Sequence, residues 1–370
     1  MTVLGPVAPP SLGITLTHEH LLCDLRSRWH PPPPDRPDLA ALVEIDPRPQ
    51  DRGPLSGDPY VCRPNLLLDD PQLMVEELRY FREAGGGALV ELTTRGLHPR
   101  PADLRRISAR SGVQIVAGCG WYRQVTDPPG LRELPEEALA ETMVREITEG
   151  YATAAGEATV RPGIIGEIGT GDPLHADEVK SLRAAARAQR QTGLAIAVHL
   201  ALWGRQGEAV MDVLERAGAD PSRVLLCHLG EQPGALDYHR ALLERGACLG
   251  FDTFGAEYAL DTIGRRLATD EERVAGLLPL LDAGYSGRLF LSHDICERLQ
   301  LRAYGGYGYA HLLTTIRPRL RRAGVDEVTL DTLLRANPAR LLACPAQAGP
   351  DGGQKMGVAV ATVRPELQAL

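Results

Sequence analysis

The stretch "IIGEIGTGDPLHADEVKSLRAAARAQRQTGLAIAVHL" (164–200) decides the fold. It begins with the apolar run 164–169 and ends with the apolar run 195–200, and both have the length and the Ile and Val content of buried strands. Residues 177–193 between them show apolar positions at helical spacing, and Gly193 is a typical helix stop. A strand, a helix and a second strand predict parallel pairing through a right-handed crossover.

The same alternation of short apolar runs and helical patterns, such as 207–218 and 271–284, fills the chain after residue 85. The expected strands are 13–22, 87–94, 113–120, 164–169, 195–200, 224–230, 248–254 and 289–295. Eight strands in about 330 residues favour an α/β fold of the (β/α)8 TIM-barrel type. An open doubly wound sheet is disfavoured because no GxGxxG follows the first strand.

Composition and charge are those of an ordinary globular chain. The 370 residues are 44% hydrophobic and carry a net charge of -8, which argues against a nucleic-acid or anionic-membrane partner. The chain has no apolar run of about 18 residues, and its N-terminus does not resemble a secretory signal. Seven scattered cysteines without a CxxC pair indicate reduced thiols, so we expect a cytoplasmic protein. A homodimer would be ordinary for this class.

Two segments depart from the alternation of strands and helices. One lies within the expected barrel domain, residues 1–344, and the other follows it. Residues 30–64 hold ten of the 29 prolines and follow the first strand, so this insertion emerges at the barrel mouth. It either covers part of the mouth or is a stiff surface insertion. Residues 345–370 begin Gly/Pro-rich and are expected to form a loosely attached C-terminal tail.

Metal-ligand side chains gather at the ends of the expected strands. These residues are His18, His20, Glu167, His199, His228 and Asp294. The carboxyl ends of barrel strands form the face where active sites lie, so the sequence predicts a metal site there. Taken singly, each residue has an ordinary alternative, such as a hydrogen-bonded structural histidine, a turn residue at Glu167 or a helix cap at Asp294.

The number of ligands indicates the kind of site. Four imidazoles and two carboxylates exceed the three protein ligands that a catalytic zinc usually takes. Glu167 could bridge two divalent ions, whose shared hydroxide would attack a carbonyl or phosphoryl centre, with Asp294 as ligand and base. These ligands suit zinc, and equally manganese, cobalt or iron.

Several motifs carry a family resemblance between Gly13 and Leu342. They are "LTHEHLL" (16–22), "IIGEIG" (164–169), "VLLCHL" (224–229), "LSHD" (291–294) and "YGGYGYAHLL" (304–313). In these motifs the chain resembles the phosphotriesterase family of the amidohydrolase superfamily, and in particular its phosphotriesterase-related branch.

The resemblance implies a role for each ligand. The more buried metal would be held by His18, His20 and Asp294, the more exposed one by His199 and His228, and Glu167 would bridge both. The founding phosphotriesterases use a carboxylated lysine where this chain has Glu167. The organophosphate-hydrolysing members also carry a histidine after the strand-seven aspartate, whereas Asp252 is followed here by Thr253. A phosphotriester is therefore disfavoured as the natural substrate.

Related branches hydrolyse lactones, carboxylate esters and N-acyl amides, so we expect a carbonyl substrate, by resemblance an amide, with phosphoester hydrolysis a minor activity. The alternatives are a mononuclear, deaminase-like member of the superfamily and a non-catalytic binding barrel. The stretch "GCGWYRQ" (118–124) and the eighth loop should supply the substrate contacts. The candidates are Trp121, Tyr122, Arg298, Arg302 and Tyr304, with Arg123 beside them. Each arginine could instead form a surface salt bridge.

Other residues of these types are expected outside the site. Glu19 and His293 should alternate away from the metals and form packing or supporting hydrogen bonds. Cys227 should face the helices as a small buried hydrophobe. Five further histidines are expected to be solvated: His30, His98, His175, His239 and His311.

Overall fold

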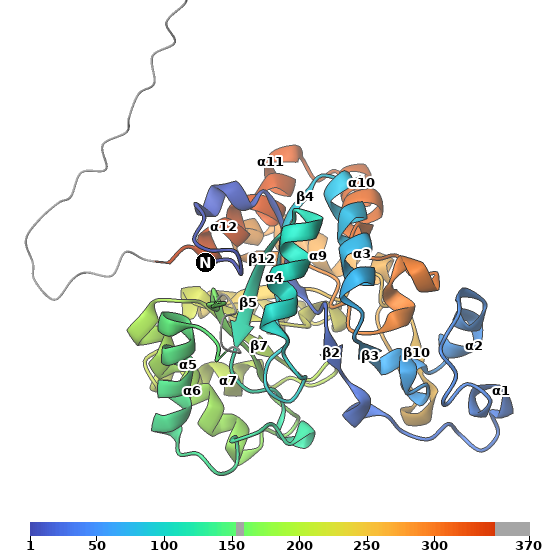
Figure 1. The fold of residues 1–370 in the computed structure, drawn as a ribbon. Coiled ribbons are helices and arrows are strands. Elements are labelled where there is room, and N and C mark those ends of the chain that lie inside the picture. The colour runs from blue at the N-terminus through green and yellow to red at the C-terminus, as the bar shows by residue number, and fades with distance from the viewer. Residues whose placement is uncertain (153–158, 345–370) are drawn as a thin grey trace, which may run out of the picture.

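The computed structural model describes residues 1–152 and 159–344, so the predicted tail 345–370 lies outside the described residues. Eight parallel strands form one sheet in the order β1-β4-β5-β6-β7-β8-β9-β12, which curls into a nearly closed barrel (Figure 1). The strands are β1 (Ile14–Glu19), β4 (Gly86–Glu91), β5 (Gln114–Cys119), β6 (Ile164–Gly169), β7 (Ile196–His199), β8 (Val224–Leu226), β9 (Cys248–Phe251) and β12 (Leu289–Leu291). The predicted (β/α)8 barrel is confirmed.

The barrel closes between β1 and the residues that follow β12. The His18 backbone N–H donates to Ser292 Oγ over 2.9 Å, and the Asp294 backbone N–H donates to the His18 carbonyl over 3.1 Å. Closure therefore draws the first and last expected metal ligands of the chain toward one another.

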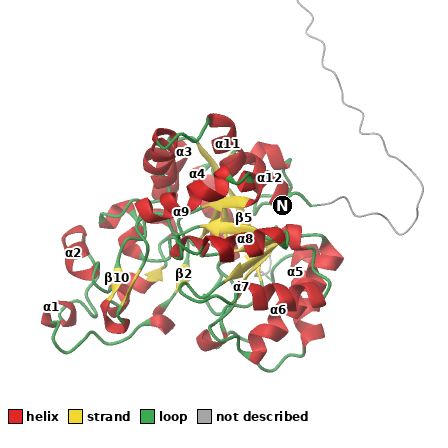
Figure 2. Ribbon diagram, turned by 180° about the vertical axis from the view of Figure 1, so that it is seen from behind, coloured by secondary structure: helices red, strands yellow, loops and turns green. Residues whose placement is uncertain are grey.

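Helices surround the barrel, and Figure 2 shows them on the outside of the strands. They are α3 (Pro71–Glu83), α4 (Pro101–Ser111), α5 (Glu136–Glu149), α6 (Ala176–Thr192), α7 (Gly207–Arg216), α8 (Leu236–Glu244), α9 (Asp270–Asp282), α10 (Arg317–Arg322), α11 (Glu327–Asp331) and α12 (Asn337–Leu342). Helix α6 matches its prediction to within a residue, and Gly193 ends it with a φ of 71°. That left-handed conformation is the reason for a glycine there.

Apolar residues form two layers on either side of the sheet. The larger layer, which includes Ile196 and Leu226, packs between strands and helices. The smaller one fills the barrel and includes Ala197, Leu225 and Cys227. The prediction that Cys227 faces the helices was wrong. Alternation along β8 puts residues 225 and 227 inside, and His228 still reaches the site because the strand has already ended.

The Pro-rich insertion is folded. It contains the short helices α1 (Pro37–Ala40) and α2 (Arg52–Leu55), which lie apart from the ring of barrel helices in Figures 1 and 2. A small apolar cluster inside it ends on Leu299 of the eighth loop. Two antiparallel ribbons lie nearby, β2 (Cys23–Asp24) with β3 (Leu67–Leu68) and β10 (Ala259–Leu260) with β11 (Arg265–Arg266).

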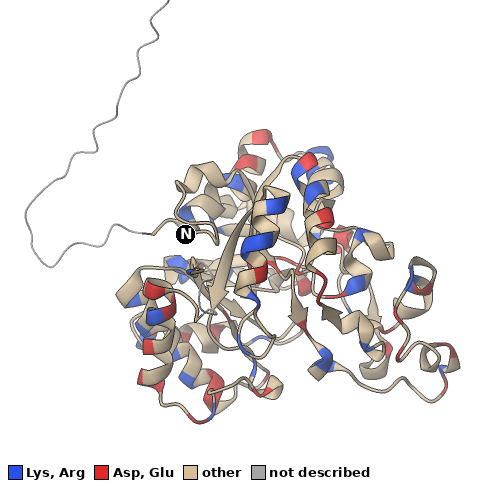
Figure 3. Ribbon diagram, in the orientation of Figure 1, with Lys and Arg blue, Asp and Glu red and all other residues tan. Residues whose placement is uncertain are grey.

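Acidic and basic residues are interspersed along the outer helices, α5 and α6 among them (Figure 3). None of the helices in the described ranges has both the length and the apolar character needed to cross a membrane. All seven cysteines are free thiols, and six of them are buried.

Two histidines expected to be solvated are buried. His311 lies 2.6 Å from Asp270 Oδ2, and His239 of α8 has its ring centroid 5.7 Å from that of Phe251. Their contacts come from distant parts of the chain, Asp270 for His311 and Phe251 for His239, which helical spacing alone did not reveal. His30 is partly buried, and His98 and His175 are exposed as expected.

Burial lowers the pKa of His239 from 6.5 to about 4. Below pH 6.5 the unfolded chain binds a proton at this residue that the folded chain does not, so the free energy of unfolding falls as the pH drops toward 4. His239→Leu should remove this loss, which amounts to roughly 3 kcal/mol at most. Urea unfolding of both proteins at pH 7, 5.5 and 4.5 measures it. A difference between variant and wild type that stays constant with pH contradicts the prediction.

Candidate metal centre

Six side chains converge at the carboxyl ends of the strands, where the sequence predicted them. Their ligand atoms form two overlapping groups that share Glu167, one with His18 and His20 and the other with His199 and His228. Asp294 groups with His18 and His228. All six residues are buried or nearly so, and they come from β1, β6, β7 and the residues that follow β1, β8 and β12.

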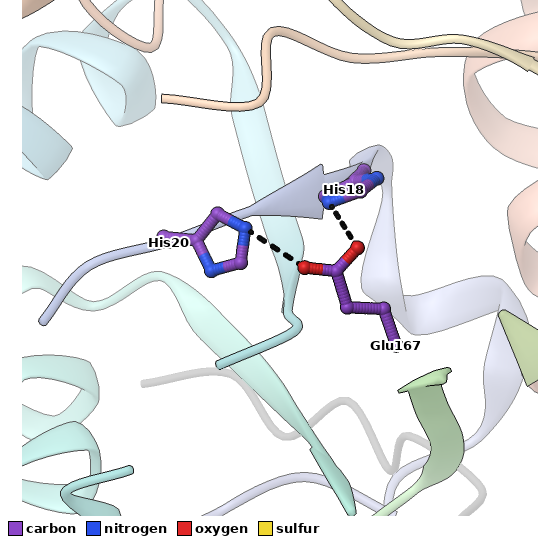
Figure 4. Close-up of side chains that lie close together, drawn as sticks. All are labelled: His18, His20 and Glu167. Atoms are coloured by element: carbon purple, nitrogen blue, oxygen red, sulfur yellow. Dashed lines mark ion pairs between the residues drawn. The ribbon is translucent and has the colours of Figure 1, made fainter. Parts of the chain in front are cut away.

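The spacing of these atoms fits a metal coordination shell. His18 Nε2 lies 3.4 Å from Glu167 Oε2, and His20 Nε2 lies 3.5 Å from Glu167 Oε1 (Figure 4). Asp294 Oδ1 is 3.2 Å from His20 Nε2. Ligands at 2.0–2.1 Å from a tetrahedral ion are about 3.4 Å apart, so these distances leave room for an ion between the atoms.

The other side of Glu167 repeats the arrangement. His199 Nδ1 lies 3.5 Å from Glu167 Oε2 and 2.9 Å from His228 Nε2. The two carboxylate oxygens of Glu167 are therefore divided, with Oε1 toward His20 and Oε2 toward His18 and His199. A carboxylate in this position can bind two ions at once.

Two of these atoms are buried without any hydrogen-bond partner, His18 Nε2 and Glu167 Oε2. An unsatisfied buried polar atom costs about 1–3 kcal/mol, and more when it is charged. A divalent ion satisfies both atoms together. The residues present therefore fit a metal centre.

Strained backbone directs two of the ligands. His228 has a φ of 67° and Asp294 a φ of 52°, and both therefore lie in the left-handed region that side chains other than glycine rarely adopt. The chain turns sharply after β8 and β12 and brings these side chains over the barrel. Glycine is required at position 166, before Glu167, because a Cβ there would stand 2.3 Å from the Ala197 carbonyl oxygen.

Asp252 contacts two of the candidate ligands through their Nδ1 ring nitrogens, a role that was not predicted from the sequence. Its Oδ2 lies 3.0 Å from His18 Nδ1, and its Oδ1 lies 3.2 Å from His228 Nδ1 and accepts the His228 backbone N–H. One carboxylate thus orients two ligands, the usual second role of an acid near a metal. Burial opposes its ionisation, but His228 and His18 together lower the pKa of Asp252.

Glu19 and His293 stay off the cluster, as alternation predicted. Glu19 Oε1 accepts hydrogen bonds from Ser292 Oγ and the His293 backbone N–H, and its Oε2 accepts the Ile295 backbone N–H. His293 Nδ1 lies 2.7 Å from Glu19. This buried network holds the turn that carries Asp294.

A cavity of about 200 Å³ opens beside the ligands, and its wall includes His20, Glu167, His199 and Asp294. The other lining residues that matter for its chemistry are Arg28, Tyr60, Tyr122 and Arg123. Of the residues expected near the substrate, Tyr122 and Arg123 line it, and the Tyr122 hydroxyl lies 3.3 Å from His199 Nδ1. Burial lowers the pKa of His199, and the positive charges of His228, Arg123 and Arg28 lower it further.

Four expected substrate contacts lie outside this cavity. The Trp121 indole donates to the Pro129 carbonyl. Arg298 pairs with Asp46 and Asp69 and lies near the Tyr304 ring, and Arg302 lies over the Tyr80 ring. The eighth loop turns toward the insertion and away from the candidate ligands, so the salt-bridge alternative holds for Arg298, whereas Arg302 packs on a tyrosine ring. Arg28, which the sequence analysis did not single out, was detectable as a cation shortly after the first strand.

Comparisons with known proteins agree with this geometry. The model of the phosphotriesterase family matches residues 1–342. The N-acetyltaurine hydrolase of Tetraodon nigroviridis is 35% identical over 353 residues, which span 92% of this chain and 97% of that one. A crystal structure of a resiniferatoxin-binding protein from Rhodobacter sphaeroides superposes with a TM-score of 0.88 at 39% identity, covering 92% of this chain and 94% of the other.

A lactonase of phosphotriesterase type from Deinococcus radiodurans, solved as a mutant, superposes with a TM-score of 0.71 at 29% identity, covering 93% of this chain and 99% of that one. The matches extend over the whole barrel, including all the strands that carry the ligand cluster. The chain therefore belongs to the phosphotriesterase family and is a hydrolase.

Proposed function

We propose that this chain is a binuclear metal-dependent amidase that cleaves a small N-acyl amine. The observation that carries the proposal is that Glu167 belongs to two ligand groups at once, one with His18 and His20 and the other with His199 and His228. A mononuclear site would need only one of these groups. The amide is favoured by the N-acetyltaurine hydrolases that match this chain over 97% of their length.

The residues present would hold the ions in the way expected from the sequence. His18, His20 and Asp294 would bind one ion, His199 and His228 the other, and Glu167 both. Ions in these positions would polarise the substrate carbonyl and activate water. Zinc suits the imidazole and carboxylate donors, as do manganese, cobalt and iron.

Asp294 is suited to move the proton. Its side chain is 18% exposed, whereas that of Glu167 is 2% exposed, so Asp294 opens to the cavity. A carboxylate there can accept a proton from the attacking water and pass it to the departing amine, which cannot leave as an anion. The residue after Asp252 is Thr253, so this position supplies no imidazole for a proton relay. The Thr253 hydroxyl donates to Glu231 instead.

Tyr122 and the cavity size define how the substrate is held. The Tyr122 hydroxyl stands beside His199 and is available to a substrate oxygen. The volume of about 200 Å³ is below the roughly 300–1,000 Å³ typical of pockets for drug-sized ligands. A compact acyl amine fits this limit better than a lipid amide.

A substrate panel tests the proposal. Purified protein loaded with zinc or manganese is assayed with N-acetyl amines, N-acetyl amino acids, lactones, aryl esters and a phosphotriester at equal concentrations. We expect the largest kcat/KM for an N-acetyl amine or N-acetyl amino acid. A kcat/KM that is largest for a lactone would reassign the bond, and turnover of none of these classes would contradict the hydrolytic proposal.

A further inference from the structure

Two arginines of the cavity wall have no anionic partner among the described residues. Arg28 ends the short 3-10 helix Arg26–Arg28 after β2, and Arg123 follows β5, so they approach the cavity from different loops. Within residues 1–152 and 159–344 neither side chain forms an ion pair or a side-chain hydrogen bond. Arg123 Nε is fully buried and unsatisfied, and the Arg28 guanidinium lies 5.7 Å from the centroid of the Tyr60 ring.

Nearby arginines outside the cavity are paired. Arg26 forms an ion pair with Asp24, and Arg95 forms one with Glu146. The carboxylates that share the cavity with Arg28 and Arg123 are otherwise engaged: Glu167 and Asp294 belong to the ligand cluster. Asp172 is exposed and makes no ion pair with either arginine in the described part of the chain. Both side chains are partly buried, and a partly buried guanidinium without an anion is costly, which indicates that an anion arrives from outside the protein.

The position of the two arginines defines which part of a substrate they meet. They line the same small cavity as His199 and Tyr122, and their charges reach both of these side chains. A single compact molecule can therefore touch the ligand cluster at one end and the guanidiniums at the other. Guanidinium groups bind planar or tetrahedral oxyanions through paired charge-assisted hydrogen bonds.

We propose that Arg28 and Arg123 form an anion subsite that binds a sulfonate or carboxylate on the amine half of the substrate. This inference rests on the proposed amidase function and specifies its substrate class, an N-acyl amine with a terminal acid. The acyl half would then face the ligand cluster. N-acetyltaurine, the compound in the name of the related hydrolases, belongs to this class because taurine ends in a sulfonate. An N-acetyl β-amino acid, which ends in a carboxylate, belongs to it equally.

The test compares charged and uncharged substrates in matched variants. N-acetyltaurine, N-acetyl-β-alanine and the uncharged N-propylacetamide are assayed with wild type, Arg28→Met, Arg123→Met and the control Arg26→Met, whose arginine is paired with Asp24. For the preferred acid, we expect kcat/KM to fall about 10- to 100-fold in each cavity variant, mainly through KM. In the cavity variants the uncharged amide should lose much less than the acid, and in Arg26→Met every substrate should change less than about twofold. The ratio of the two acids distinguishes sulfonate from carboxylate.

Binding of the same acids, measured by calorimetry, is independent of turnover. Arginine-dependent binding without hydrolysis would support the subsite while contradicting the amidase. Hydrolysis with equal losses on charged and uncharged amides would leave the amidase intact and overturn the subsite, because the arginines would then act through structure alone. Unchanged kcat/KM and binding in both cavity variants would also overturn it.

Discussion

Glu167→Gln is expected to lower the metal content of the protein from two ions per chain toward one and to reduce kcat by about 10³-fold or more. The amide keeps one oxygen but loses the charge and the second donor oxygen, so it cannot hold ions on both sides. His18 and His199 both face Glu167 Oε2, at 3.4 and 3.5 Å, and each group of ligands would be left incomplete.

Elemental analysis of purified variant and wild type measures this effect alongside turnover. Glu149→Gln, an exposed substitution at the end of α5, is the matched control and should keep both properties. Thermal unfolding of the metal-free proteins shows whether the variant still folds. Full activity and undiminished metal in Glu167→Gln would contradict the bridging role.

Asp294→Asn should keep most of the metal and lose about 10²- to 10⁴-fold in turnover of an alkyl amide. Asparagine retains one ligand oxygen facing His18 and His20 but cannot accept and deliver a proton. The loss should be smaller for an aryl ester, since a phenolate departs without being protonated. Rates on the two substrates, with metal content measured in parallel, test this role.

An unchanged rate in Asp294→Asn would mean that the proton acceptor is another group. An equal loss on amide and aryl ester, together with lost metal, would mean that Asp294 acts only as a ligand. Both outcomes differ from the expected pattern, which separates proton transfer from metal binding.

The barrel and the convergence of the six candidate ligands were predictable because both follow from local periodicity. Helical spacing in 177–193 and apolar runs on either side define a crossover, and parallel strands bring their carboxyl ends to one face. His18 and His20 share a face for the same reason. The structure confirms the fold, and it brings together the residues that sequence position had placed at that face.

Periodicity does not predict the direction of side chains beyond the ends of the strands. Cys227 continues the inward alternation of Leu225, and His228 reaches the site as well only because β8 has ended and His228 adopts a left-handed conformation, which the sequence pattern does not anticipate. The eighth loop directs Arg298 and Arg302 to the surface through pairing with Asp46 and stacking on Tyr80. Both contacts join segments far apart in the sequence.

Asp252 shows a different limit. Its strand position was evident, but its function depends on reaching His18 and His228 at once. The distances from Asp252 to His18 and His228 depend on how the strands close into a barrel, which the sequence pattern does not specify. Arg28 is similar, because the sequence does not say whether Arg26 or Arg28 pairs with Asp24 and which one is left to face the cavity.

Metal stoichiometry tests the central claim most directly. Protein purified without chelators, and the same protein after chelation and reloading with zinc or manganese, is analysed for ions per chain while hydrolysis of an N-acetyl amine is followed on each sample. The account predicts two ions per chain, loss of turnover on chelation and recovery as the second ion binds. Full turnover with one ion per chain, or turnover that survives complete chelation, would contradict it.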